Sequence, residues 1–238
     1  MIGRLLDPLL ADAPGGLGAW YGAYKTWRWG DPYVRLVATL ADRRRLAVDV
    51  GAHEGEWTFF MRRHAALCVA FECNPHLLAR LQRRFGASVA LRPEAVSDQA
   101  GVTELRIPRA PDGSGLGRAT IEAANPLDGA FTRVDVLRVA TVRLDDVIER
   151  PVGLIKVDVE GHELAVLRGA AGILARDRPN LVLELEDRHA PGCVAAARAL
   201  LAGYGYRAAY LRDSRLEALP DGGPLPAGLW NFVFTAAD

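Results

Sequence analysis

The feature that most restricts the fold is a regular alternation, from Leu46 onwards, of short apolar runs with stretches of helical periodicity. The apolar runs predict strands at residues 46–50, 67–71, 88–91, 152–158 and 181–185. The stretches between them predict helices at residues 56–64, 162–175 and 194–202, and one that opens after Asn74-Pro75 and runs to about Phe85. Strands that are apolar along nearly their whole length are typical of parallel sheets with both faces covered. The sequence therefore predicts an α/β fold with a doubly wound, mostly parallel sheet.

Two later segments depart from this alternation. Residues 206–211 and 229–234 flank a loop rich in Gly and Pro with no helix between them, which predicts an antiparallel hairpin at the edge of the sheet. Residues 109–131 form a long loop, also rich in Gly and Pro, between strand candidates at 103–107 and 134–139. Loops of this length in compact domains are usually functional or disordered. We interpret this one as a mobile lid near the active site, with a solvated insertion as the alternative.

Residues 1–45 are expected to form an N-terminal helical extension, and residues 46–238 the main domain. Three aromatic residues share one helical face in the extension by their spacing: Trp20, Tyr24 and Trp27. Asp31-Pro32 is typical of the N-cap and first turn of a second helix, which would reach about Ala41. The aromatic face would pack the extension onto the main domain. The alternatives are a pocket wall, a dimer surface or a membrane-surface contact.

Charge and cysteine content exclude several classes of protein. The 29 basic and 29 acidic residues balance, so the chain has no net charge to attract a nucleic-acid backbone. The three cysteines have neither metal-ligand spacing nor the even number of a disulfide framework, which favours a reducing compartment. The first residues do not form the uninterrupted apolar stretch typical of a secretory signal, and no apolar run reaches about 18 residues. We expect a cytoplasmic protein with no membrane span and no nucleic-acid partner. The sequence leaves a homo-oligomer open.

The strand at residues 46–50 leads into a glycine turn, and an acidic residue ends the next strand. Gly51 and Gly55 lie four residues apart, which is not the three-glycine spacing of the dinucleotide fingerprint. Glycine at a strand end lets the backbone approach a ligand closely. Glu72 stands where doubly wound folds place a carboxylate that reaches ribose hydroxyls. The pattern predicts a cofactor with a ribose group, and the alternative is a tight turn with an N-capping acid.

A second group of charged residues surrounds the end of the strand at residues 152–158. Lys156 and Asp158 point to the same side of that strand. A lysine within an apolar strand needs a partner, because an unpaired buried charge is costly. The group continues into the following turn and onto the next strand, with Glu160, His162, Glu163, Glu184 and Glu186. Ligands bind at such strand ends in open α/β sheets. The alternative is a buried ion-pair network that closes the turn.

These motifs occur in a distinctive order along the chain. The segments are Val48-Asp-Val-Gly-Ala-His-Glu-Gly55, Phe71-Glu-Cys-Asn-Pro75, Ala95-Val-Ser-Asp98, Ile155-Lys-Val-Asp-Val-Glu-Gly-His-Glu163 and the strand of Glu184. Together they resemble the FkbM family of S-adenosylmethionine-dependent methyltransferases, over roughly residues 46–186. The resemblance implies a Rossmann-like class I methyltransferase sheet of seven strands, the last of them antiparallel. It also implies O-methylation of a hydroxyl on a small-molecule or glycan acceptor: a sugar, glycan or secondary metabolite.

The resemblance assigns roles to individual positions. It implies that Gly51 and Gly55 line the methionine and ribose part of S-adenosylmethionine, and that Glu72 binds the ribose hydroxyls. The full set of expected cofactor-binding residues is Asp49, Gly51, Ala52, His53, Gly55, Glu72, Cys73, Asn74, Ser97 and Asp98. Ser97 and Asp98 would lie near the adenine. Two positions depart from the family pattern: His53 stands where Asn is usual, and Cys73 where Pro is common.

The methyl acceptor is expected at the end of the strand at residues 152–158. The expected catalytic set is Lys156, Asp158, Glu160, His162 and Glu163. We expect Asp158 and Glu160 to orient the acceptor hydroxyl, because an ion pair with Lys156 weakens a carboxylate as a base. The base would then be His162 or Glu163.

Three alternatives stay open at this stage. No metal site is assigned, but a divalent ion could bridge the carboxylates at this strand end. A nicotinamide-dependent oxidoreductase would use the same kind of sheet. A catalytically inactive methyltransferase-like subunit would keep the motifs and only bind a partner.

Overall fold

The computed structural model describes residues 24, 30–110, 115–127, 131–220, 225–226 and 228–236. Of the three aromatic residues expected to share a helical face, Trp20 and Trp27 lie outside the described residues. Parts of the long loop at residues 109–131 and of the loop before residue 229 also lie outside them.

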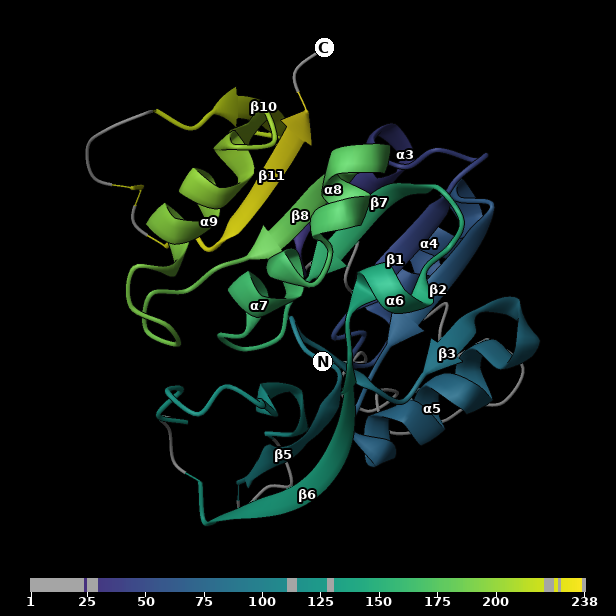
Figure 1. The fold of residues 1–238 in the computed structure, drawn as a ribbon, viewed down its shortest axis with the longest axis vertical. Helices are drawn as coiled ribbons and strands as arrows, with labels where there is room; N and C mark the ends of the chain where they lie inside the picture. Colours follow the sequence, from purple (N-terminus) through teal and green to yellow (C-terminus); the bar gives the residue numbers. More distant parts are fainter. Residues whose placement is uncertain are drawn as a thin grey trace, which may run out of the picture.

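Within the described residues, eight strands form a central sheet in the order β10-β9-β11-β8-β7-β1-β2-β3 (Figure 1). They are β1 (Leu46–Val50), β2 (Leu67–Phe71), β3 (Ala90–Arg92), β7 (Val152–Val157), β8 (Asn180–Glu184), β9 (Tyr206–Arg212), β10 (Arg215–Ala218) and β11 (Asn231–Ala236). The run β3, β2, β1, β7 and β8 is parallel throughout. β11 runs antiparallel to both of its neighbours, β8 and β9. The predicted α/β fold with a mostly parallel sheet is confirmed.

Helices cover both faces of this sheet. One face carries η1 (Pro32–Leu36), α3 (Val37–Leu40), α4 (Glu56–His64) and α5 (Pro75–Phe85), which is followed by η2 (Gly86–Ser88). The other face carries α6 (Leu144–Val147), α7 (Glu163–Arg168), α8 (Ala171–Asp177) and α9 (Cys193–Ala202). Successive residues of β1 serve opposite faces, with Ala47 packed on the first side and Val48 on the second. This two-sided burial explains why the strands read as continuous apolar runs.

A smaller sheet lies beside the carboxyl ends of the central strands (Figure 1). It contains β4 (Ala95–Val96), β6 (Arg133–Val142) and β5 (Gly101–Arg109) in the order β4-β6-β5. β5 and β6 pair along their whole length. The described part of the loop between them forms η3 (Leu116–Arg118) and then pairs with β5 at Thr120, which bridges to Arg106.

The single helix predicted at residues 162–175 is wrong, because the segment forms two helices, α7 and α8. The break lies at Gly169, whose carbonyl oxygen accepts a hydrogen bond from the backbone N–H of Asp145 at 3.0 Å. The Asp145 carboxylate accepts from the backbone N–H of Gly172 at 2.9 Å and of Ile173 at 3.0 Å. These bonds satisfy the exposed N–H groups at the start of α8, so a distant side chain begins a new helix here.

The C-terminal hairpin is antiparallel as predicted, but its position at the sheet edge is wrong. β11 lies between β8 and β9, and the unpredicted strand β10 forms the edge, which gives one strand more than the family resemblance implies. β9 and β10 are joined at Asp213 and Ser214, whose φ angles are 48° and 64°. Two-residue hairpin turns with both φ angles positive usually contain glycine. The absence of glycine from this turn explains why the sequence pattern missed β10.

The described end of the N-terminal region is attached to the sheet through Tyr33. The N-cap expected at Asp31 is present, since its carboxylate accepts the backbone N–H of Tyr33 at 2.9 Å. The Tyr33 hydroxyl donates to the carbonyl of Asn231 at 2.7 Å and accepts the N–H of Leu211 at 2.8 Å. The helix expected to reach Ala41 is a 3-10 turn followed by α3. The division of the chain at residue 45 stays a prediction.

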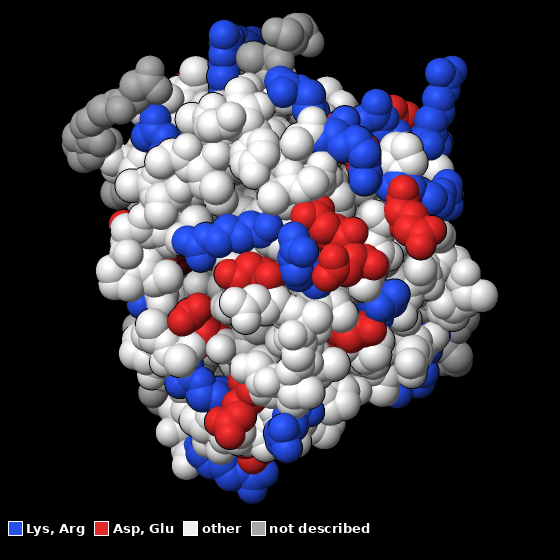
Figure 2. Space-filling view, in the orientation of Figure 1, with Lys and Arg blue, Asp and Glu red and all other residues white. Residues whose placement is uncertain are grey.

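The surface carries mixed charge across the middle of the face shown in Figure 2, where basic and acidic side chains are interspersed. The equal numbers of the two charges are therefore also mixed in space on that part of the molecule. None of the helices in the described part of the chain has the length and apolar character needed to cross a lipid bilayer.

Candidate active site

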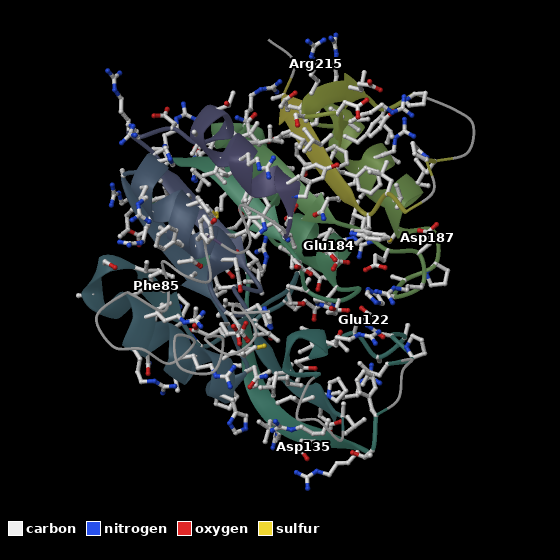
Figure 3. All side chains as sticks on the ribbon, turned by 180° about the vertical axis from the view of Figure 1, so that it is seen from behind. Phe85, Glu122, Asp135, Glu184, Asp187 and Arg215 are labelled. Atoms are coloured by element: carbon white, nitrogen blue, oxygen red, sulfur yellow. The ribbon has the colours of Figure 1, made fainter. Side chains whose placement is uncertain are left out.

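A cavity of about 130 Å³ lies at the carboxyl ends of β1, β2 and β7. Gly51, Glu72 and Asp158 line it from these three strand ends, and residues 116–121 supply part of the opposite wall. Figure 3 shows oxygen-bearing side chains gathered between Glu184 and Glu122, beside the same strand ends. The position agrees with the general rule that ligands of open α/β sheets bind beyond the carboxyl ends of the strands.

The two glycines of the first loop have different surroundings. Gly51 has a φ of 78°, and a Cβ atom there would lie 1.9 Å from the backbone oxygen of Asp158. Glycine is therefore required for β1 to end against the end of β7. Gly55 has a φ of 84°, but a Cβ atom there would meet the side chains of Phe85 and Leu81 in α5. Gly51 lines the cavity, whereas Gly55 lets α4 begin close to α5.

Glu72 joins the two loops that flank the cavity. Its carboxylate accepts the backbone N–H of His53 and that of Asn74, each at 2.8 Å. Burial raises the pKa of Glu72 to about 7 despite these two bonds. Each carboxylate oxygen has a second lone pair that can accept a ligand hydroxyl. His53 and Cys73 also line the cavity, while the Asn74 side chain caps α5.

Asp49, Ala52, Ser97 and Asp98, which were also expected to bind the cofactor, are not among the residues that line the cavity. Asp49 is buried and accepts the Thr58 hydroxyl at 2.5 Å, and burial raises the pKa of Asp49 to about 6. Ala52 is buried behind the same loop. Ser97 and Asp98 follow β4, whose residues Ala95 and Val96 reach the cavity themselves.

Lys156 is fully buried, and its ammonium lies 3.3 Å from the Asp158 carboxylate. Burial acts to lower the pKa of Lys156, but the nearby carboxylates, first Asp158 and then Glu184, hold it above its ordinary value. The Trp57 ring lies 5.6 Å from the ammonium. The partner that the sequence argument required is therefore present, and Lys156 neutralises part of the acidic cluster from within the sheet.

The turn after β7 brings the expected acids and His162 together but gives them different partners. Asp158 and Glu160 line the cavity. His162 lies between the Ser97 hydroxyl, 2.9 Å from Nε2, and the Glu122 carboxylate, 3.0 Å from Nδ1. Of Asp158, Glu160, His162 and Glu163, only Asp158 and Glu160 line the cavity.

Glu163 is buried and closes the turn. Its Oε1 atom accepts the backbone N–H of Val159 at 3.2 Å and of Gly161 at 3.0 Å. Burial raises the pKa of Glu163 to about 7, against the lowering effect of these bonds. One carboxylate oxygen thus satisfies two backbone donors that the sharp turn leaves without carbonyl partners.

Several site residues were not selected by the sequence argument. Thr120 and Asn125 both donate to the carbonyl of Glu160, at 2.9 and 2.7 Å. His189 follows β8 and its Nε2 lies 3.2 Å from the Glu160 carboxylate. The position of His189 beyond a parallel strand end was the available signal, and no local motif accompanied it. Within the described residues, no group of three or more His, Cys, Asp or Glu side chains is arranged to hold a metal ion.

A protein-family match covers more than half of the chain. The family model described as the methyltransferase FkbM domain matches residues 49–208. No curated protein matches the sequence.

Many solved structures match the fold, and two of them illustrate the likeness. The first is methyltransferase FkbM from Methylobacillus flagellatus KT, with 14% identity and a TM-score of 0.53 over 97% of this chain and 58% of that one. The chain thus spans little more than half of that protein. The second is a Streptococcus mutans protein described as a methyltransferase and solved in complex with SAH, with 11% identity and a TM-score of 0.50 over 86% of this chain and 96% of that one. At these identities the likeness is one of fold.

Proposed function

The chain belongs to the FkbM methyltransferase family, and we propose that it transfers a methyl group from S-adenosylmethionine to a hydroxyl group of a sugar, glycan or secondary metabolite. One observation carries the proposal. Glu72 and the pair Asp158 and Glu160 line the same cavity, within the segment that matches the family model.

The residues around the cavity suit S-adenosylmethionine in their chemistry. Glu72 offers buried carboxylate oxygens to the two ribose hydroxyls. Phe71, Leu77 and Val96 supply apolar walls for the rest of the molecule. Of the expected cofactor residues, we propose direct contact for Gly51, His53, Glu72 and Cys73. We propose that the others act by shaping the loops that hold these four.

The acceptor would lie beside Asp158 and Glu160, at the end of β7. S-adenosylmethionine, when bound, supplies a methyl group that its sulfonium has already activated. The protein then has to align the acceptor oxygen with that methyl group and take up the hydroxyl proton. Asp158 is held by Lys156, which favours a role in orienting the hydroxyl.

Calorimetry tests the cofactor assignment. We expect S-adenosylmethionine to bind the wild-type protein, and NAD to give no binding heat. Glu72→Ala should weaken S-adenosylmethionine binding by roughly 1–3 kcal/mol, which is about 5- to 150-fold in Kd, because it removes a hydrogen-bonded carboxylate from the cavity. Glu54→Ala is the matched control, since Glu54 lies in the same loop but pairs with Arg80 on α5. Equal affinity in wild type and Glu72→Ala would remove the ribose assignment.

The size of the cavity predicts movement of residues 115–127. Its volume of about 130 Å³ is below the roughly 300 Å³ typical of small-molecule sites. Part of the cavity wall belongs to this segment, and we propose that it shifts when the ligands bind. We expect hydrogen exchange in residues 115–127 to slow when cofactor and acceptor are bound, as for a closing lid, while exchange in β7 stays unchanged. Unaltered hydrogen exchange in residues 115–127 would favour the alternative, a solvated insertion that does not close over the site.

A further inference from the structure

His189 and Glu160 form a pair at the edge of the cavity. His189 is buried, with 4% of its surface exposed. Its Nε2 atom lies 3.2 Å from Oε2 of Glu160, an ion-pair distance between two buried atoms whose geometry is not that of a hydrogen bond. Glu160 reaches the cavity from the end of β7, whereas His189 comes from the segment after β8. Two neighbouring strand ends thus place an imidazole against a carboxylate of the proposed acceptor site.

The backbone at Glu160 is held in an unfavourable conformation. Its φ angle is 56°, in the left-handed region that residues with a Cβ atom rarely adopt. Thr120 and Asn125, from the loop between β5 and β6, donate hydrogen bonds to its carbonyl oxygen. Glu163 fixes the N–H groups of Val159 and Gly161 on either side of it. Strain that surrounding contacts impose in this way is characteristic of functional sites.

The charges that face Glu160 come from several elements. Asp158 at the end of β7, Glu186 after β8 and Glu163 of α7 are acidic, and Arg118 of η3 is basic. Burial, followed by the charge of Asp158, raises the pKa of Glu160 to about 7. His189 is the titratable base that lies against the carboxylate itself. A carboxylate with a raised pKa takes up a proton more readily than an ordinary one.

We propose that Glu160 accepts the proton of the acceptor hydroxyl, and that His189 is a positioning residue that holds the Glu160 carboxylate at the cavity wall. This inference rests on the proposed function. In the step, the acceptor oxygen forms a bond to the methyl carbon. The bond between that carbon and the sulfonium sulfur breaks, and its electron pair stays on sulfur. The hydroxyl proton passes to the Glu160 carboxylate.

This assignment differs from the sequence-based expectation that His162 or Glu163 is the base. Both ring nitrogens of His162 already face protein groups, Ser97 and Glu122. Oε1 of Glu163 accepts the two N–H groups that close the turn, and Glu163 does not line the cavity. Glu160 lines the cavity and has the His189 imidazole within ion-pair distance of its carboxylate.

The pair is tested first without any acceptor, by NMR of the imidazole nitrogens. The chain has five histidines, so single substitutions assign each signal. Glu160→Gln should move the Nε2 resonance of His189 and leave that of His162 in place. Glu122→Gln is the matched control and should do the reverse, because Glu122 faces His162. An unmoved His189 resonance in Glu160→Gln would overturn the pair.

The proton transfer is tested with labelled S-adenosylmethionine and a panel of methyl glycosides. Glu160→Gln should lower kcat about 100-fold or more, and His189→Gln roughly 10-fold, with unchanged Kd for S-adenosylmethionine. In wild type, kcat should fall as the pH drops below about 7, since the base must be deprotonated. This decrease of kcat at low pH should be absent in Glu160→Gln. If Glu160→Gln had the same kcat as wild type, the proposal would be overturned. Failure of wild type on every glycoside would instead count against the proposed acceptor class, and the NMR comparison would still decide the pair.

Discussion

Replacing Gly51 with alanine is expected to lower the free energy of unfolding by roughly 3 kcal/mol or more. The added Cβ atom would lie 1.9 Å from the backbone oxygen of Asp158, so one of the two central strands must shift. The positive φ angle adds a backbone penalty of about 1–2 kcal/mol. Thermal unfolding should show a melting temperature roughly 6–12 °C lower, given about 2–4 °C for each kcal/mol in a domain of this size.

Gly192→Ala separates the two contributions. Gly192 has the same φ angle of 78°, but no atom lies within 4 Å of the position of an added Cβ. Only the backbone penalty should remain there, and the loss of stability should be clearly smaller than at Gly51. If the free energy of unfolding falls by the same amount in both variants, the close approach of β1 and β7 at Gly51 adds no cost to the alanine substitution.

Replacing Glu163 with glutamine is expected to stabilise the protein at about pH 8 and to change little at about pH 5. Burial raises the pKa of Glu163 from its ordinary value of 4.5 to about 7. As the pH rises from about 4.5 to about 7, the unfolded chain loses this proton while the folded chain keeps it, so stability falls over that window. The cost above pH 7 is on the order of 3 kcal/mol. Glutamine keeps an oxygen for the two turn N–H groups and carries no charge, so the cost disappears.

Chemical unfolding of wild type and Glu163→Gln across this pH range measures the effect. Glu94→Gln is a control of opposite sign, because its hydrogen bonds with Arg92 lower the pKa of Glu94. The stability that Glu94 contributes is present above its unfolded pKa and is lost as the pH falls, so its removal should destabilise the protein near neutrality. A difference between wild type and Glu163→Gln that stays constant with pH would show that the Glu163 carboxyl is not perturbed by folding.

Much of the fold could be predicted because its strands are buried on both faces. The bounds of β1 and β2 agree residue by residue with the predicted apolar runs. The start of α5 was predictable from the N-cap Asn74 and the proline after it. These signals lie within or next to the elements that they predict, and tertiary contacts do not change the bounds of those elements.

The features that could not be predicted depend on contacts between distant residues. Asp145 lies far along the chain from the break that it creates between α7 and α8. Likewise, Glu122 and His189 reach the site from a long loop and from a segment with no motif of its own. Sequence spacing placed the charged residues at a strand end that borders the cavity. It could not show which carboxylate faces the cavity, because Glu160 and Glu163 differ only in the direction that the turn gives them.

The position of β11 has a consequence for synthesis on the ribosome. β11 follows β8 and β9 in the chain but lies between them in the sheet. Until residue 236 has emerged, β8 and β9 both present unpaired backbone edges, and each is a ready partner for the other or for a neighbouring nascent chain. The position between β8 and β9 must stay unfilled until β11 has been made and can pair with both strands. The edge of β8 is thus open to mispairing from the synthesis of residue 184 until that of residue 236, and shielding of that edge over this interval would protect the nascent chain.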